Sequence, residues 1–166
     1  SGMKAVMIGA TDIERGEADV VLAGGIESMS QAPFLLSYRA RFGLKFGNQE
    51  IQDHMILDGL TDVFNKVHMG MTAEKLVEEF DISRQEQDEF AYNSQMKAKA
   101  AIENGKFKDE IVPVEIPDKK GVKLFDTDEH PRFDVTLESL AKLKPAFKPD
   151  GTITAGNASG INDGGS

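Results

Sequence analysis

The stretch ADVVLAGG, residues 18–25, decides the fold class of this 166-residue chain. It is a short apolar run that ends in a pair of glycines, as buried strands of parallel sheets often do. The residues before it favour a helix, because Met3, Val6 and Ile13 recur at helical spacing and Gly16 provides a stop signal. A helix that leads into a buried strand predicts an α/β fold.

Residues 29–51, MSQAPFLLSYRARFGLKFGNQEI, depart from this pattern. They combine turn residues, scattered aromatic residues and several basic residues, with no acidic residue before Glu50. Two interpretations are open. The segment is either an arm or hairpin that contacts another subunit, or a solvated loop anchored by a few aromatic side chains.

Helical patterns follow from residue 72, with Thr72 as a candidate cap. The sequence SRQE, residues 83–86, is a capping box, in which the Ser83 hydroxyl accepts from the Glu86 amide while the Glu86 side chain reaches back. The helix that this motif begins is predicted to end at Asn104-Gly105, a strong C-terminal signal.

A strand, a loop and a short helix are predicted next. DEIVPVEI, residues 109–116, favours a strand, and Pro113 places it at an edge or an irregularity. Residues 117–134 are polar and are expected to form a loop. TLESLAKLKPAF, residues 136–147, predicts a short helix that begins at Thr136 and ends before Pro145.

Composition excludes several classes of function. The net charge of -9 argues against nucleic acid or an anionic membrane as the main partner, because either requires a basic surface. The chain contains no cysteine, which excludes a disulfide, a thiol nucleophile and a thiolate metal site within it. This is compatible with the cytosol. No apolar run approaches the roughly 18 residues of a transmembrane helix.

The glycine-rich stretch TITAGNASGINDGGS, residues 152–166, is not a phosphate loop of the Walker type, because no Lys and hydroxyl follow its glycines. Gly and Ala leave the main chain bare, so a ligand could lie against it; a plain solvent loop is the alternative. His68 directly precedes a predicted helix and could contact a ligand, although a lone histidine is more often structural. His54 and His130 are given no role, and no metal site is expected.

Several motifs together resemble the thiolase family, in particular its acetyl-CoA acetyltransferases of the biosynthetic, short-chain type. The matching segments follow the family in order and spacing and cover essentially the whole chain. They are SGMKAV, ADVVLAGGIESMSQAP, DGLTD, HMGMTAE, SRQEQDEFA, GKFKDEIVPV, AKLKPAF and TAGNASGINDG. The His-Met pair of VHMG is the feature that favours the short-chain branch.

The resemblance implies an α/β, thiolase-like fold, of which this chain is a fragment. Residues 1–28 would be part of the N-terminal αβαβα core, with the nucleophile helix and one core strand. Residues 29–154 would form an inserted, mainly helical loop domain that binds coenzyme A and contacts other subunits. Residues 155–166 would be the return turn into the core. Both ends are therefore expected to cut through structured regions.

The resemblance also implies a binding site for a coenzyme A thioester, which is a substrate, with no separate cofactor and no metal. Leu60 and Met69 would pack against the pantetheine and the acyl end, and His68 would contact the pantetheine. Arg132 and Ser139 would meet the nucleotide. Ala155 and Ser159 would lie along the pantetheine chain. No catalytic residue is expected within the chain, because the family's Cys, Asn and His motifs would precede Ser1 or follow Ser166.

The activity implied for the intact enzyme is a reversible Claisen condensation of two acetyl-CoA to acetoacetyl-CoA and coenzyme A. Alternatives are a degradative 3-ketoacyl-CoA thiolase and a non-catalytic fragment for coenzyme A binding and assembly. The chain alone is expected to be inactive. The expected partners are coenzyme A, the rest of the thiolase chain and further copies in a cytoplasmic homotetramer, with no nucleic acid and no membrane.

Overall fold

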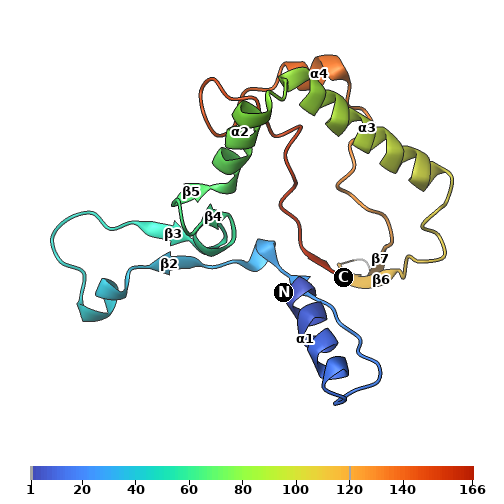
Figure 1. Cartoon of the computed structure of the whole chain (residues 1–166), viewed down its shortest axis with the longest axis horizontal. Coiled ribbons are helices and arrows are strands. Elements are labelled where there is room, and N and C mark those ends of the chain that lie inside the picture. Colours follow the sequence, from blue (N-terminus) through green and yellow to red (C-terminus); the bar gives the residue numbers. More distant parts are fainter. Residues whose placement is uncertain (1, 120) are drawn as a thin grey trace. The chain divides into compact units, whose positions relative to one another are not determined.

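The computed structural model describes residues 2–119 and 121–166. These residues form two compact units, Ser1–Met69 with Ile161–Ser166, and Gly70–Gly160. Figure 1 labels most of their helices and strands. The domain boundaries implied by the resemblance, at residues 28 and 154, stay a prediction.

The first unit begins with helix α1, Gly2–Glu14, and the predicted stop is confirmed. Gly16 has a φ of 71°, in the left-handed region where a side chain would be strained. After this turn the chain comes back along the helix. The returning segment lies very close to it, since a Cβ at Gly9 would be only 2.7 Å from Cγ1 of Val21. A glycine at position 9 therefore allows close packing of the returning segment.

The buried strand predicted at residues 18–25 does not form. These residues have no strand structure, and Val20 and Leu22 are 87% and 101% exposed. The first strand, β1 (Ile26–Glu27), comes directly after them and pairs antiparallel with β8 (Gly164–Gly165). A buried parallel strand needs a neighbour on each side. Of residues 18–25, Gly25 exchanges backbone hydrogen bonds with Ser166, at 2.8 and 2.9 Å, and no paired strand flanks the others in the part of the chain described.

The segment after β1 contains a hairpin, as one interpretation of the sequence predicted. A short 3-10 helix, Met29–Gln31, leads into β2 (Phe34–Leu36), which pairs antiparallel with β3 (Ile51–Asp53). A second 3-10 helix, Tyr38–Phe42, lies between the two strands. Its contact with another subunit stays a prediction.

A π-helix, Met55–Gly59, and a second small hairpin connect β3 to the next helix. The strands β4 (Thr61–Asp62) and β5 (Val67–His68) pair antiparallel, and α2 (Met69–Phe80) begins at once after β5. The expectation that Thr72 caps this helix is therefore wrong. The hairpin runs straight into the helix and places Thr72 inside it.

The second unit is mainly helical, and its helix ends follow the sequence signals. Helix α3, Arg84–Glu103, begins with the complete capping box of Ser83 and Glu86 and ends at Asn104. Helix α4, Leu137–Ala141, is capped by Thr136. Both predicted N-termini are confirmed, because each depends on hydrogen bonds between residues three positions apart.

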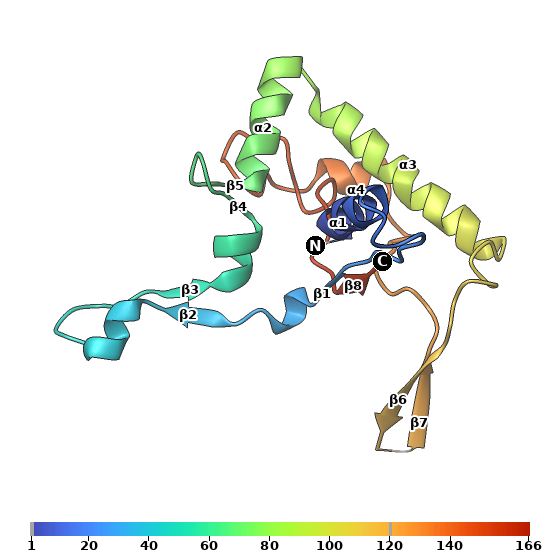
Figure 2. The ribbon, with the colours of Figure 1, turned by 60° about the horizontal axis from the view of Figure 1, so that its bottom comes forward.

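The strand predicted across Pro113 begins only after it. Strand β6, Val114–Asp118, pairs antiparallel with β7, Gly121–Phe125, so part of the region expected to be a polar loop is a hairpin. Pro113 has no N–H to donate, which explains the late start. Figure 2 shows this hairpin extending away from α3 and α4, and its described residues are all exposed.

The core of the second unit combines apolar and charged residues. Leu140 and Ile153 are the buried hydrophobic residues of the described chain, and Glu74, Asp88 and Thr154 are buried polar residues. Such burial of carboxylates requires hydrogen-bond partners, which the glycine-rich segment supplies.

Candidate functional site

Residues 152–160 of the glycine-rich segment belong to the second unit, where Gly156 lies close against α4. A Cβ at Gly156 would come within 2.5 Å of Cδ2 of Leu140 and 2.6 Å of Cδ1 of Leu143, so no larger residue fits without movement. The turn is closed locally, because the backbone N–H of Thr154 donates to Oδ1 of Asn157 at 2.7 Å. Thr154 is fully buried, whereas Ala155 next to it is exposed.

Arg132 is held near this segment through its backbone. The backbone N–H of Arg132 donates to Oε1 of Gln95, on α3, at 2.8 Å. Within the same loop, the backbone N–H of His130 donates to Oδ1 of Asp128 at 3.0 Å. The loop before α4 is thus fixed to α3, while the guanidinium of Arg132 remains accessible.

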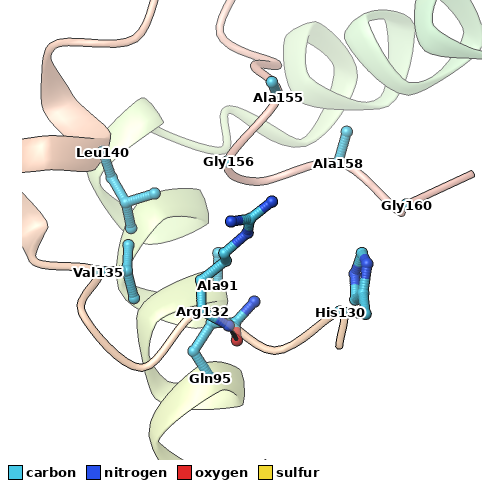
Figure 3. Close-up of a pocket in the computed structure, with 10 residues that line it drawn as sticks. All are labelled: Ala91, Gln95, His130, Arg132, Val135, Leu140, Ala155, Gly156, Ala158 and Gly160. Atoms are coloured by element: carbon cyan, nitrogen blue, oxygen red, sulfur yellow. Dashed lines mark hydrogen bonds between the residues drawn. The ribbon is translucent and has the colours of Figure 1, made fainter. Parts of the chain in front are cut away.

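These elements enclose a pocket of about 210 Å³ in the second unit. Figure 3 shows the Arg132 side chain extending from its loop toward the segment that carries Gly156 and Ala158, with His130 nearby. The lining residues are Ala91, Gln95, His130, Arg132, Val135, Leu140, Ala155, Gly156, Ala158 and Gly160.

The pocket has two chemically different sides. Arg132 offers a permanent cation, and His130 and Gln95 add polar groups. The opposite side is alkyl groups and bare backbone. This combination fits a ligand with an anionic and an apolar part. Because whole drug-sized ligands occupy about 300–1,000 Å³, the pocket fits only part of an extended one.

Two of the predicted binding residues, Arg132 and Ala155, meet in this pocket. Ser159 lies between two lining residues, Ala158 and Gly160, and is exposed. Ser139 is exposed on α4, but its hydroxyl is engaged in the helix cap. Its backbone N–H donates to Oγ1 of Thr136, and its own hydroxyl donates to the Thr136 carbonyl at 2.8 Å.

The start of α4 is also negatively charged. The pKa of Glu138 lies below its ordinary value, because its carboxylate accepts hydrogen bonds from its own backbone N–H and from the Thr136 side chain. The carboxylate therefore remains ionised where the helix dipole is positive.

The other three predicted residues are gathered in the first unit. The backbone N–H of Met69 donates to the carbonyl of Leu60 at 2.8 Å, and His68 pairs with Thr61 in the β4–β5 hairpin. Leu60 and His68 are half-buried and Met69 is 53% exposed. His68 directly precedes α2, as predicted from the sequence. The hairpin brings these three residues together.

Sequence reasoning missed His130 and Gln95. His130 lies in a stretch interpreted as a polar loop, and only its spacing of two residues from Arg132 could have singled it out. Gln95 lies within a helix whose polar residues look like an ordinary solvated face. Its role depends on a contact 37 positions away in the sequence, which no local pattern indicates.

Among residues 2–119 and 121–166, no group of three or more His, Cys, Asp or Glu side chains could hold a metal ion. None of the helices described is both long and apolar enough to cross a membrane.

Comparison with known proteins gives a consistent result. Residues 1–166 match the family model described as "Thiolase, N-terminal domain". A probable acetyl-CoA acyltransferase of Staphylococcus aureus strain MSSA476 is 58% identical over 165 residues, which is 99% of this chain and 42% of that protein. The chain thus spans less than half the length of the curated relatives it matches.

Solved structures support the fold. An acetyl-CoA acetyltransferase of Bacillus anthracis is 49% identical, with a TM-score of 0.90. The matched part is 100% of this chain and 41% of the Bacillus chain. A human mitochondrial 3-ketoacyl-CoA thiolase is 47% identical, with a TM-score of 0.90. The matched part is 99% of this chain and 42% of the human chain. The predicted α/β, thiolase-like fold is confirmed.

Proposed function

This chain belongs to the thiolase family, whose N-terminal domain it matches, and on that premise we propose that it supplies the coenzyme A-binding part of an acetyl-CoA acetyltransferase. In the proposed reaction, one acetyl-CoA transfers its acetyl group to a cysteine thiolate and releases coenzyme A. A second acetyl-CoA gives a methyl proton to a second cysteine thiolate and attacks the acyl carbon, which yields acetoacetyl-CoA and restores the first thiolate.

One observation carries the binding role, namely the position of Arg132 opposite a bare backbone wall. The guanidinium suits the phosphates or the adenine of the nucleotide. The small residues Ala155 and Ala158 leave room for the narrow pantetheine chain. We propose that Ser159 extends this wall and that Ser139 lies beside the nucleotide.

The hairpin residues of the first unit would serve the other end of the ligand. We propose that Leu60 and Met69 contact the acyl end and that His68 contacts the pantetheine. Both apolar side chains are at least partly accessible, and His68 lies at the start of α2, where a polar ligand group is favoured.

No covalent step is assigned to the chain itself. It contains no cysteine, so the acylated nucleophile must come from residues outside these 166. The chain alone is expected to show no thiolysis or condensation. Cleavage of acetoacetyl-CoA above the uncatalysed rate by the mass-verified 166-residue chain would contradict this. A role limited to coenzyme A binding and assembly is what the isolated chain could still perform.

A degradative 3-ketoacyl-CoA thiolase is the second candidate function. It is favoured by the likeness to the human mitochondrial enzyme, which has nearly the same identity as the Bacillus enzyme. The two candidates differ in acyl chain length, because a short-chain enzyme has no need to accommodate a long acyl group.

Thiolysis by the full-length protein distinguishes them. If it is an acetyl-CoA acetyltransferase, kcat/KM for acetoacetyl-CoA should exceed that for 3-ketooctanoyl-CoA by about tenfold or more, a difference of about 1.4 kcal/mol. Equal or reversed values would support the degradative enzyme. Absence of activity with both would contradict the proposed function.

We also propose that the full-length protein is a cytoplasmic homotetramer, in which the β2–β3 arm contacts another subunit. The arm exposes Phe42 and Phe46, which are 76% and 109% accessible, beside Arg39 and Lys45. Exposed aromatic residues of this kind are enriched at protein interfaces. Sedimentation of the full-length protein tests the mass of the assembly, and a monomer would contradict the proposal.

A further inference from the structure

One buried carboxylate holds the start of the glycine-rich segment. Glu74, on α2, is only 2% exposed. Its Oε1 accepts from the backbone N–H groups of Thr152 and Ile153, both at 2.9 Å, and its Oε2 accepts from the Thr152 hydroxyl at 3.3 Å. A Cβ at Gly151 would lie 2.3 Å from Oε1 of Glu74, so this approach requires glycine there.

A second buried carboxylate, on α3, holds the end of the same turn. Asp88 is 5% exposed, and its Oδ1 accepts from Nδ2 of Asn157 at 2.9 Å. Asn157 in turn accepts from the Thr154 backbone and donates to the Thr152 carbonyl at 3.1 Å. This amide and its carboxylate partner therefore fix the end of the turn, whose tip is also closed by hydrogen bonds from the backbone N–H groups of Gly156 and Ala158 to Thr154.

Arg84 connects the same carboxylate to α4. Its Nε donates to Oδ2 of Asp88 at 2.8 Å, and its Nη2 donates to the carbonyls of Leu140 and Leu143 at 2.7 and 3.1 Å. Removing charged groups from water costs free energy that largely offsets the attraction between them. A buried cluster of this kind therefore adds little to the stability of the fold. The cluster does fix the geometry of α3, α4 and the glycine-rich segment relative to one another.

The same face of α3 also holds Arg132. Asp88, Ala91 and Gln95 are spaced at i, i+3 and i+7, which places them on one side of the helix. Asp88 binds the glycine-rich turn, and Gln95 binds the backbone of Arg132. Ala91 lies between them and lines the pocket (Figure 3).

We propose that Asp88 is a positioning residue for the ligand, because α3 sets the distance between the backbone wall and the cation. Through Asn157, Asp88 places the wall that carries Ala155. Through Gln95, the same helix places Arg132. Loss of the carboxylate would let the wall shift relative to the cation without removing any group that contacts the ligand. This inference rests on the proposed coenzyme A binding.

The test is steady-state thiolysis of acetoacetyl-CoA by the full-length protein, with KM for coenzyme A and kcat measured separately. For Asp88→Ala and Asn157→Ala, we expect KM to rise about tenfold while kcat stays within about twofold, since only ligand placement is affected. Glu86→Ala is the matched control. It lies on the same helix and loosens its first turn, but it has no contact with the glycine-rich segment. Its thermal midpoint should fall while KM stays unchanged.

An unchanged KM in the folded Asp88→Ala and Asn157→Ala variants would overturn the proposal. So would an equal rise in KM for Glu86→Ala, since that would indicate a general effect of stability. If Asp88→Ala does not fold, Asn157→Ala carries the test alone, because it removes the same contact from the other side, and an unchanged KM in that variant would overturn the proposal.

Direct titration of the wild-type protein with coenzyme A separates this inference from the proposed function. Wild-type protein that binds no coenzyme A contradicts both. Wild-type protein that binds, together with Asp88 and Asn157 variants that bind equally well, contradicts the positioning role alone.

Discussion

The backbone N–H of Arg132 donates a hydrogen bond to Oε1 of Gln95 at 2.8 Å, across 37 positions of the sequence. This contact fixes the backbone that carries an exposed cationic side chain to α3. A cation fixed at its base loses less freedom when it binds an anion, which is why such a contact affects affinity without touching the ligand.

Replacing Gln95 should therefore weaken binding. Gln95→Ala removes the acceptor and should raise the dissociation constant for coenzyme A by about three- to tenfold, the range of one hydrogen bond. Calorimetric titration of the full-length protein measures it. Gln85→Ala is the matched control on the same helix, because its amide donates to Glu89 and not to the loop of Arg132. Equal affinities for the two variants would show that Gln95 plays no part.

The capping box of α3 predicts a pH dependence of stability. Hydrogen bonds from the Ser83 side chain and backbone hold the pKa of Glu86 below its ordinary value of 4.5. A lowered pKa in the folded state stabilises the protein above the ordinary value, and this contribution is lost as the pH falls through the folded pKa. The thermal midpoint of the wild type should exceed that of Glu86→Ala at neutral pH, and the difference should shrink below about pH 4.5.

Glu86→Gln provides the control for this titration. It keeps an acceptor for the Ser83 groups but carries no proton that titrates in this range. Its difference from Glu86→Ala should not change with pH. A wild-type advantage that stayed constant down to about pH 3 would show that ionisation of Glu86 is irrelevant.

Packing around Gly70 predicts a cost for even one methyl group. A Cβ at Gly70 would lie 2.3 Å from the ring of Phe147, so Gly70→Ala should lower the free energy of unfolding by about 1–3 kcal/mol. Denaturant unfolding of the full-length protein measures the loss. Gly59→Ala is the control, because a Cβ there meets nothing within 4 Å. A loss no larger for Gly70→Ala than for Gly59→Ala would contradict the packing.

The sequence predicted those features that depend on neighbouring residues. The capping box at Ser83 and the cap at Thr136 are local hydrogen-bond patterns, so both helix starts were predictable. The strand expected at residues 18–25 failed because its burial depends on neighbouring strands rather than on its own composition. The strand predicted at residues 109–116 overlaps β6, but β7 was missed because its apolar residues lie in a stretch that is otherwise polar and was interpreted as a loop.

The predicted and the missed residues of the candidate site differ for a similar reason. Arg132 and Ala155 were named from family resemblance, and the structure places both at one pocket. The buried carboxylates of Glu74 and Asp88 could not be predicted, because acidic residues are rarely buried and nothing local marks these two. Their partners in the glycine-rich segment lie 69 or more positions away in the sequence.

Titration of the full-length protein with coenzyme A at two salt concentrations tests the central claim most directly. Wild-type protein should bind, Ser159→Phe should abolish binding by filling the space beside the backbone wall, and Arg132→Ala should weaken binding and flatten its salt dependence. Arg41→Ala, on the exposed arm, should bind like the wild type. Equal heats for wild type, Ser159→Phe and Arg132→Ala would contradict the account, because these positions would then not form the coenzyme A site.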